Sequence, residues 1–233
     1  MKKTHIKAKT KQSDNLKRII LFDMDGTLTP PREEMESFMV KKICQLSAHS
    51  RIGIVSGSDF DYIIQQCAVM FGPGGVEIDK VDILPCNGTK LYRWKNGHHQ
   101  LDYNVDMIKE IGAMSYRRIL AKIFDYQADI SKFYPDIPFT GTFFQYRGSM
   151  LNWCPIGRSA DSTQRKDWKK WDKNYHIRKI YMKELQEFIS QSGIAVTIAL
   201  GGSTSFDIYP LGWDKTYALG HYGDYEVFFV GDK

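Results

Sequence analysis

The chain has 233 residues and a mass of 26.9 kDa, which is enough for one large domain or for a core with a smaller inserted domain. Hydrophobic residues make up 42% and charged residues 25%, and no apolar run approaches the roughly 18 residues of a spanning helix, so the composition indicates a globular protein without a membrane segment. The formal charge is +5, but residues 1–18 hold seven basic residues against one aspartate, which accounts for the whole excess.

Residues 1–17 are predicted to form a basic, disordered tail. They lack the interleaved aromatic side chains of a nucleic-acid arm and the apolar segment of a signal peptide, so we expect no nucleic-acid partner and no secretion. The cysteines have no paired spacing that would build a zinc site or a redox motif, which predicts reduced thiols and a cytoplasmic protein. These cysteines are Cys44, Cys67, Cys86 and Cys154.

The first part of the chain alternates strand and helix patterns. Apolar runs at 18–22, 51–56 and 81–86 predict strands, and residues 35–46 and 59–70 between them have helical periodicity. A last apolar run, from 226, predicts a strand that returns to the same sheet. Alternation of this kind predicts an α/β core built on a parallel sheet, formed by residues 18–88 and 213–233.

Residues 89–212 have a different pattern, which predicts an inserted cap domain. A long helical stretch from about 104 to 130 is followed by two short β runs joined by a glycine-containing turn. A charged helix over 174–191 then precedes two more β runs, separated by Gly201-Gly202. This αββαββ order predicts an α+β cap whose antiparallel sheet has its helices on one side.

Polar residues follow the ends of the predicted core strands, where open parallel sheets bind their ligands. Asp23 is placed to act as a nucleophile that becomes an aspartyl phosphate, and Asp25, two residues on, as its acid/base partner. Hydroxyl and backbone N–H groups of Ser56, Gly57 and Ser58 are predicted to bind phosphate oxygens. Lys215 is predicted to neutralise charge on the phosphoryl group.

A magnesium ion is the predicted cofactor at this edge. The side chains of Asp23 and Asp232 and the backbone carbonyl of Asp25 would supply the hard oxygen ligands that Mg²⁺ prefers. Each of these residues taken alone is uninformative, but their occurrence at successive strand ends is much harder to explain by chance.

The segment DMDGTLT, residues 23–29, resembles the signature of the haloacid dehalogenase superfamily of phosphotransferases. The segments LFDMDGTLTPPR, IGIVSGSDF, TFFQYRGSMLNWCPIGRS, GGSTSFDIYPLGWDKTYAL and FFVGDK resemble eukaryotic-type phosphomannomutases, over nearly the whole chain after the tail. The resemblance implies a Rossmann-like core with a cap. It also implies interconversion of mannose 6-phosphate and mannose 1-phosphate, with a hexose 1,6-bisphosphate as intermediate and activator, for the synthesis of activated mannose.

The resemblance also implies which cap residues bind the substrate. Three arginines match those that hold the distal phosphate, and three further residues match positions near the sugar: Arg147, Arg158, Arg165, Asn152, Ser205 and Asp207. Arg32 matches an arginine just beyond the catalytic turn. A mutase must hold one phosphate in the cap while the other reacts in the core, and guanidinium groups suit that task. Members of the family pair through their caps, so a cap-to-cap homodimer is expected.

The sequence departs from the family pattern in three places. The family continues beyond the final Gly-Asp-Lys, whereas Lys233 is the last residue here, so we expect a fragment or a shortened relative with weakened magnesium affinity and core stability. Ser56 replaces a glycine of the family, and Cys86 replaces an acidic residue before the Asn87-Gly88 turn. We expect neither replacement to abolish the chemistry.

Three functions stay open at this point. A sugar-phosphate mutase is favoured by the cap arginines; a phosphatase would hydrolyse the same aspartyl phosphate; and a non-catalytic sugar-phosphate binding protein would have no need of Asp23, Asp25 and Lys215. The arginines are expected to bind only the phosphate group, which mannose and glucose phosphates share. The preference between these two substrates therefore also stays open.

Overall fold

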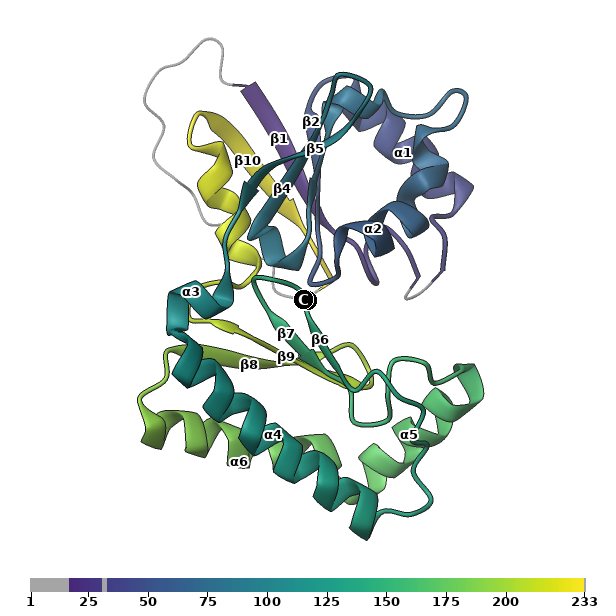
Figure 1. Ribbon diagram of the computed structural model, residues 1–233. Helices are drawn as coiled ribbons and strands as arrows, with labels where there is room; N and C mark the ends of the chain where they lie inside the picture. The colour runs from purple at the N-terminus through teal and green to yellow at the C-terminus, as the bar shows by residue number, and fades with distance from the viewer. Residues whose placement is uncertain (1–16, 31–32, 233) are drawn as a thin grey trace, which may run out of the picture.

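The computed structural model describes residues 17–30 and 33–232. These residues form two layers of sheet and helix that face each other across a cavity (Figure 1). Nearly all of the predicted tail, together with Arg32 and Lys233, lies outside the described residues. No helix within the described ranges combines the length and the apolar character needed to cross a membrane.

The core contains a six-stranded sheet with the order β10-β1-β2-β3-β4-β5. The first four strands in this order run parallel, and β4 and β5 are antiparallel additions. The bounds are β1 Lys17–Asp23, β2 Arg51–Val55, β3 Val81–Leu84, β4 Lys90–Lys95, β5 His98–Asn104 and β10 Tyr225–Val230. The predicted parallel-sheet core is therefore confirmed.

Alternate side chains of β1 enter two different cores, as the period of two in a strand requires. On one face, Phe22 packs with Ile43 of helix α1 and Ile63 of helix α2. On the other face, Ile19 and Leu21 pack against η4. The helical elements of the core are α1 Ser37–Ser47, α2 Phe60–Cys67, η1 Ala68–Phe71, η2 Ile78–Lys80, η3 Cys86–Gly88 and η4 Lys215–Tyr222.

The strands β4 and β5 correct the predicted domain boundary. The sequence pattern assigned residues 89–212 to the cap, but both strands pair with the core sheet, so the boundary lies after Asn104. The two strands form a hairpin around Asn96-Gly97, whose φ values of 52° and 82° suit a tight turn with left-handed residues. An Asn-Gly pair between β-rich runs is a strong hairpin signal, and the prediction overlooked it.

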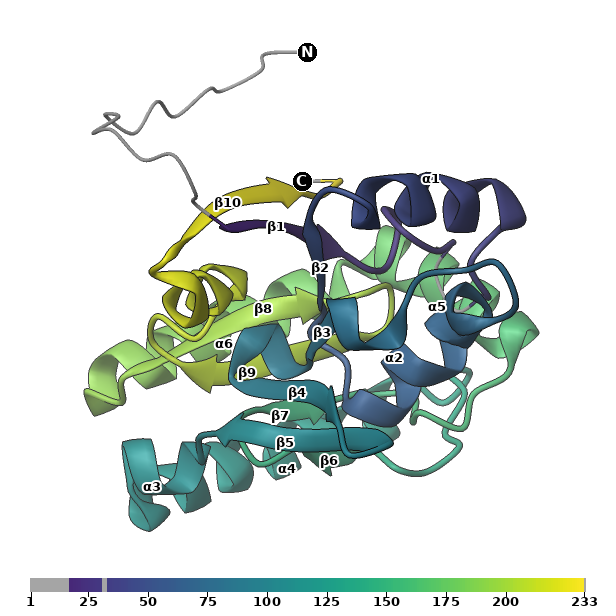
Figure 2. The ribbon, with the colours of Figure 1, turned by 90° about the horizontal axis from the view of Figure 1, so that it is seen from above.

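The cap contains a four-stranded antiparallel sheet with the order β6-β7-β9-β8, and its helices cover one face (Figures 1 and 2). This architecture confirms the predicted cap fold. The bounds are α3 Met107–Ile111, α4 Ala113–Phe133, β6 Phe144–Tyr146, β7 Leu151–Trp153, α5 Ser162–Tyr175, α6 Ile177–Ser192, β8 Val196–Gly201 and β9 Ser205–Pro210.

Helix α5 is the element of the cap that the sequence prediction missed. The predicted charged helix began at residue 174, but α5 begins after Asp161, whose carboxylate accepts a hydrogen bond from the backbone N–H of Gln164 in a capping box. His176 ends α5 in the left-handed conformation, with φ 54°, and α6 follows directly. The cap helices therefore come as two pairs.

One face of the cap sheet is apolar and the other is polar. Trp153 and Phe206 stack with ring centroids 4.6 Å apart in the core beneath the helices. Asn152 and Asp207, which alternate with these residues along β7 and β9, point to the opposite face. The period of two thus leaves a polar sheet surface toward the α/β core.

Candidate active site

The catalytic turn follows β1 directly. Asp23 is the last residue of the strand, and the carbonyl oxygen of Met24 accepts hydrogen bonds from the backbone N–H groups of Thr27, Leu28 and Thr29 at 2.9–3.2 Å. Gly26 has φ +82°, a conformation that side chains rarely adopt. The turn therefore closes tightly enough to leave both carboxylates, Asp23 and Asp25, in the wall of one cavity.

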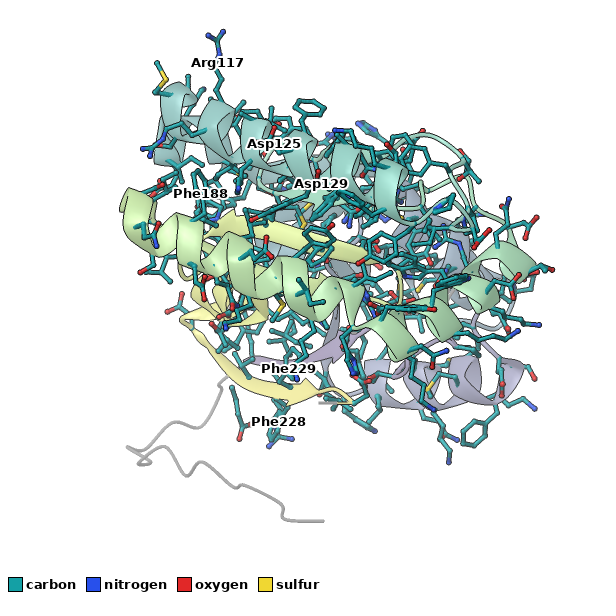
Figure 3. All side chains as sticks on the ribbon, turned by 90° about the horizontal axis from the view of Figure 1, so that it is seen from below. Arg117, Asp125, Asp129, Phe188, Phe228 and Phe229 are labelled. Carbon is teal, nitrogen blue, oxygen red and sulfur yellow. The ribbon has the colours of Figure 1, made fainter. Side chains whose placement is uncertain are left out.

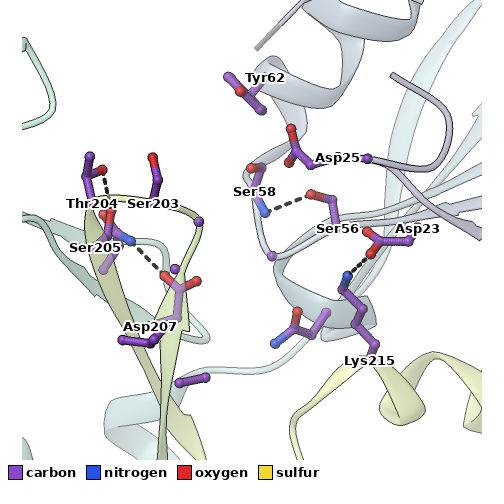
Figure 4. Close-up of a pocket in the computed structure, with 18 of the residues that line it drawn as sticks. Asp23, Asp25, Ser56, Ser58, Tyr62, Ser203, Thr204, Ser205, Asp207 and Lys215 are labelled. Atoms are coloured by element: carbon purple, nitrogen blue, oxygen red, sulfur yellow. Dashed lines mark hydrogen bonds and ion pairs between the residues drawn. The ribbon is translucent and has the colours of Figure 1, made fainter. Parts of the chain in front are cut away.

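Asp23 is paired with the lysine that the sequence analysis singled out. The Nζ of Lys215, at the start of η4, forms an ion pair with Oδ2 of Asp23. The other carboxylate oxygen accepts a hydrogen bond of 2.7 Å from the N–H of Met24. Figure 4 shows this pair, with the carboxylate of Asp25 on the side of Ser58 and away from Lys215. Both oxygens of Asp23 are therefore held in defined positions.

Asp232 approaches the same turn from the end of β10. A Cβ placed on Gly26 would lie 3.2 Å from Oδ2 of Asp232, and one placed on Gly231 would lie 3.6 Å from Cβ of Asp23. A side chain at Gly26 would therefore press on Asp232, whereas the added Cβ at Gly231 would lie in ordinary van der Waals contact with Asp23. The predicted ligands Asp23, Asp25 and Asp232 thus line the same cavity, although Asp232 is more than 200 residues from the other two in sequence.

These neighbours fit a magnesium ion. Two carboxylates and one backbone carbonyl are a hard oxygen donor set, and Mg²⁺ usually takes one or two protein carboxylates and keeps several waters. Across 17–30 and 33–232, no cluster of three or more histidine, cysteine, aspartate or glutamate side chains is arranged to hold a metal. That finding excludes an all-side-chain cage there, but it does not conflict with a donor set that includes a main-chain oxygen.

The second loop of the site follows β2. The backbone N–H of Ser58 donates a hydrogen bond of 3.1 Å to Oγ of Ser56, which shapes the loop around Gly57. The N–H of Asn87, in η3 just after β3, donates to the carbonyl oxygen of Ser56 at 2.8 Å. Its side-chain Nδ2 also donates to the carbonyl oxygen of Trp213 at 3.2 Å. Asn87 therefore connects the serine loop to the segment that carries Lys215.

The cap contributes a network of charged and amide groups. Asn152 Nδ2 donates to Oδ1 of Asp207 at 2.7 Å, and Nη1 of Arg158 donates to Oδ1 of Asn152 at 3.1 Å. Burial raises the pKa of Asp207, while the nearby Arg147, Asn152 and Arg158 act in the opposite direction. The network holds an acceptor, Asp207, on the polar face of the cap sheet.

Arg165 is mainly used to hold the cap together. It is 7% exposed, and its Nε, Nη1 and Nη2 donate to the carbonyl oxygen of Ala160, the Oγ1 of Thr204 and the carbonyl oxygen of Arg158 at 2.8–2.9 Å. These bonds fix the loop before α5 and the turn between β8 and β9. The predicted role in phosphate binding is not tested by this geometry.

A single cavity of about 1430 Å³ brings together every predicted site residue that the structure describes. Its lining includes Asp23, Asp25, Ser56, Gly57, Ser58, Arg147, Asn152, Arg158, Arg165, Ser205, Asp207, Lys215 and Asp232. Arg32, the remaining predicted residue, lies outside the described residues. Core and cap thus line opposite walls of one space, and the roles predicted for these residues stay predictions.

Several residues of this lining were not predicted from the sequence. Asn87 follows β3, so the strand-end rule that found Asp23 and Ser56 would have found it as well. Lys166 and Lys169 of α5 lie in the cap wall, and no signal pointed to them because α5 itself was not predicted.

A family model of eukaryotic phosphomannomutases matches residues 39–233 of this chain. The chain belongs to the eukaryotic phosphomannomutase family. The resemblance inferred from the sequence segments is therefore confirmed.

Relatives in this family are similar over most of their length. Phosphomannomutase 2 of Dictyostelium discoideum is 35% identical over 226 residues, which are 95% of this chain and 84% of that protein. The phosphomannomutase of Saccharomyces cerevisiae is 34% identical over 220 residues, covering 92% of this chain and 80% of the yeast protein.

Solved structures share the fold at low sequence identity. An IMP-nucleotidase of Plasmodium falciparum has a TM-score of 0.62 and 14% identity, and covers 93% of this chain. The C-terminal domain of trehalose-6-phosphate phosphatase from Candida albicans has a TM-score of 0.53 and 17% identity, and covers 86%. This chain spans 59% of each of those chains, and the likeness concerns the fold alone.

Proposed function

We propose that this protein interconverts mannose 6-phosphate and mannose 1-phosphate through a hexose bisphosphate and a phosphoryl group carried by Asp23. The proposal rests on membership in a family whose relatives are named phosphomannomutase. The observation that supports it most is the shared cavity, whose core wall holds Asp23 with Lys215 and whose cap wall holds Arg147, Arg158 and further cations. A mutase needs both walls, because its intermediate carries two phosphates.

In the first transfer, the C1 hydroxyl of mannose 6-phosphate attacks the phosphorus of phosphorylated Asp23. The bond between that phosphorus and the Asp23 oxygen breaks, and Asp25 takes the hydroxyl proton. The products are mannose 1,6-bisphosphate and a free Asp23 carboxylate. Lys215, already beside Asp23, stabilises the negative charge that gathers on the carboxylate as the bond breaks.

In the second transfer, the bisphosphate has turned so that its 6-phosphate lies at the core wall. A carboxylate oxygen of Asp23 attacks this phosphorus, the bond from phosphorus to O6 breaks, and Asp25 returns the proton to O6. Mannose 1-phosphate leaves and Asp23 is phosphorylated again, so the enzyme returns to its starting state. Asp25 therefore acts as base in one step and as acid in the other.

The residues that would hold Mg²⁺ are Asp23, Asp25 through its carbonyl oxygen, and Asp232. When bound, the ion would neutralise phosphoryl oxygens and orient the group that is transferred. Arg147 of the cap donates a hydrogen bond of 2.7 Å to the carbonyl oxygen of Gly57 in the core, which helps to hold the cap over the catalytic turn.

A single assay tests this function. The protein is incubated with mannose 1-phosphate, magnesium chloride and a trace of hexose bisphosphate, and the 6-phosphate and inorganic phosphate are both measured. Formation of the 6-phosphate without inorganic phosphate is expected. Release of inorganic phosphate alone would show that the protein is a phosphatase. Absence of any product would contradict an enzymatic function and favour a sugar-phosphate binding protein. Asp23→Asn should abolish isomerisation, since an amide is not a nucleophile for this step.

We also propose that the protein forms a homodimer through its cap. Large apolar side chains are exposed on this domain, with Phe124 54%, Phe133 71% and Phe139 47% exposed. Figure 3 shows Asp125, Asp129 and Phe188 on the side of the cap helices that faces away from the core.

Light scattering after gel filtration should give twice the chain mass, and the double variant Phe124→Ser with Phe133→Ser should give the mass of the monomer. Phe228→Ser, on β10 of the core, is the matched control and should leave the dimer intact.

A further inference from the structure

The cations of the cap wall differ in how their donors are used. Arg147 is 8% exposed, and its Nη1 donates to the carbonyl oxygen of Gly57. Arg165 is equally buried and donates to three protein acceptors. Arg165 is therefore committed to holding the cap together, whereas Arg147 uses Nη1 at the junction of cap and core and its buried Nε has no hydrogen-bond partner among the described residues.

Lys166 and Lys169 are different. Both are exposed, and they lie three residues apart on α5, so their side chains leave the helix on the same side. Both line the cavity, together with Ser162 and Arg165 of the same helix. Their ammonium groups have no hydrogen-bond or ion-pair partner within the described part of the chain, whereas the neighbouring Lys170 is paired with Asp167 at 3.2 Å.

The opposite wall of the cavity is rich in carboxylates. Asp23, Asp25 and Asp232 meet there, with Lys215 as the cation beside Asp23. A phosphate that lies away from this wall needs positive charge on the cap. A lysine on a flexible stem provides a point charge that can follow a ligand, unlike the guanidinium of Arg165, which three bonds hold in place.

We propose that Lys166 and Lys169 form an additional anion-binding position on the cap wall, which makes the site prefer sugar bisphosphates over sugar monophosphates. The inference rests on the proposed function and adds residues that select its intermediate. In the reaction, the position retains the bisphosphate by its distal phosphate while the sugar turns between the two transfers. Loss of the pair would let the bisphosphate escape more often, so the enzyme would need more of it added.

Binding measurements test this without turnover. The full chain carrying Asp23→Asn is titrated by calorimetry with glucose 1,6-bisphosphate and with glucose 1-phosphate. Adding Lys166→Ala with Lys169→Ala should weaken bisphosphate binding about tenfold, as expected for the loss of two solvated ion pairs. The affinity for the monophosphate should change less than about threefold, because Asp23→Asn carries no phosphoryl group and the single phosphate can bind at the core wall instead.

The matched control is Lys170→Ala with Lys173→Ala. It removes the same charge from the same helix, and neither residue lines the cavity. The control should leave both affinities unchanged, and all variants should keep the melting temperature of the parent because the four lysines are exposed. The proposal is overturned if the two double variants behave alike, if bisphosphate binding survives the loss of Lys166 and Lys169, or if the parent does not bind the bisphosphate.

The outcome separates this inference from the proposed function. If the protein with an intact Asp23 isomerises mannose phosphates but the Lys166/Lys169 variant binds the bisphosphate like the control, the inference fails and the function stands. If no isomerisation occurs while the lysine pair still governs bisphosphate affinity, the function fails and the anion-binding position stands.

Discussion

The Nη1 atom of Arg147 lies 2.7 Å from the carbonyl oxygen of Gly57, so a cap side chain donates a hydrogen bond to the loop that follows the second core strand. A second contact supports it, since Nε2 of Gln145 donates to Oδ2 of Asp59 at 3.2 Å. From its match to the family, Arg147 was predicted to bind the distal phosphate. The structure places its guanidinium at the junction of cap and core, where it can connect domain closure to the site.

Arg147→Ala should therefore lower kcat/KM by about 10- to 100-fold, the range expected for a charged hydrogen bond of roughly 1.5–3 kcal/mol. Small-angle scattering should show a larger radius of gyration for the variant, because the cap loses its bond to the core. Gln145→Ala removes the neutral neighbour and should have a smaller effect. A variant with unchanged kcat/KM would exclude a role for this bond in closure.

Lys215→Ala should reduce kcat by about 10²- to 10³-fold, comparable to the loss of one charge-stabilising donor in an active site. The reason is the ion pair between Nζ of Lys215 and Oδ2 of Asp23. Lys215→Arg keeps the charge and should retain more activity than the alanine variant. Equal activity of the alanine variant and the unaltered protein would contradict this role.

Gly26→Ala should abolish most of the activity and destabilise the fold by about 1–2 kcal/mol, the cost of a left-handed conformation for a residue with a Cβ. Its new Cβ would also lie 3.2 Å from Oδ2 of Asp232 and press on the predicted magnesium ligand. Gly97→Ala is the matched control, because Gly97 also has φ +82° but has no atom within 4 Å of the added Cβ. It should cost similar stability, measured by urea unfolding, and leave activity unchanged.

Asp82→Ala should destabilise the protein by about 3 kcal/mol in urea unfolding. This carboxylate is fully buried in β3 and accepts from Arg51 at 2.6 Å and from the hydroxyl of Tyr222 at 2.8 Å, so its removal leaves buried donors without an acceptor. Asp102→Ala, at an exposed ion pair with Lys95, should cost less than about 1 kcal/mol. Similar losses in both variants would argue against a buried network.

Asp207→Asn should change how stability depends on pH. Burial raises the folded-state pKa of Asp207 above the ordinary value of 3.8, so the unaltered protein loses stability from this group as the pH rises from 3.8 through the raised pKa. The side chain introduced by Asp207→Asn cannot ionise, so the variant does not lose this stability as the pH rises. Its free energy of unfolding relative to the unaltered protein should therefore increase over that window and then level off. A constant difference across the window would show that Asp207 has an ordinary pKa.

Much of the core site could be predicted from local sequence patterns. Asp23, Ser56 and Asp232 were placed correctly at strand ends, because a parallel sheet brings the carboxyl ends of its strands to one edge whatever the rest of the chain does. The αββαββ order of helical and β-rich runs likewise predicted the antiparallel cap sheet. These features depend on patterns within short stretches of neighbouring residues.

The partners of the cap cations, in contrast, depend on the three-dimensional fold. Arg147, Arg165 and Lys166 are equivalent as positive charges in the sequence. In the fold, Arg147 donates to Gly57 of the core and Arg165 donates to groups of the cap loops, whereas Lys166 lines the cavity. The same holds for Asn87, whose bond to Trp213 joins segments 126 residues apart. A side chain's partner depends on which distant acceptors the fold brings within about 3 Å, and no local pattern encodes that distance.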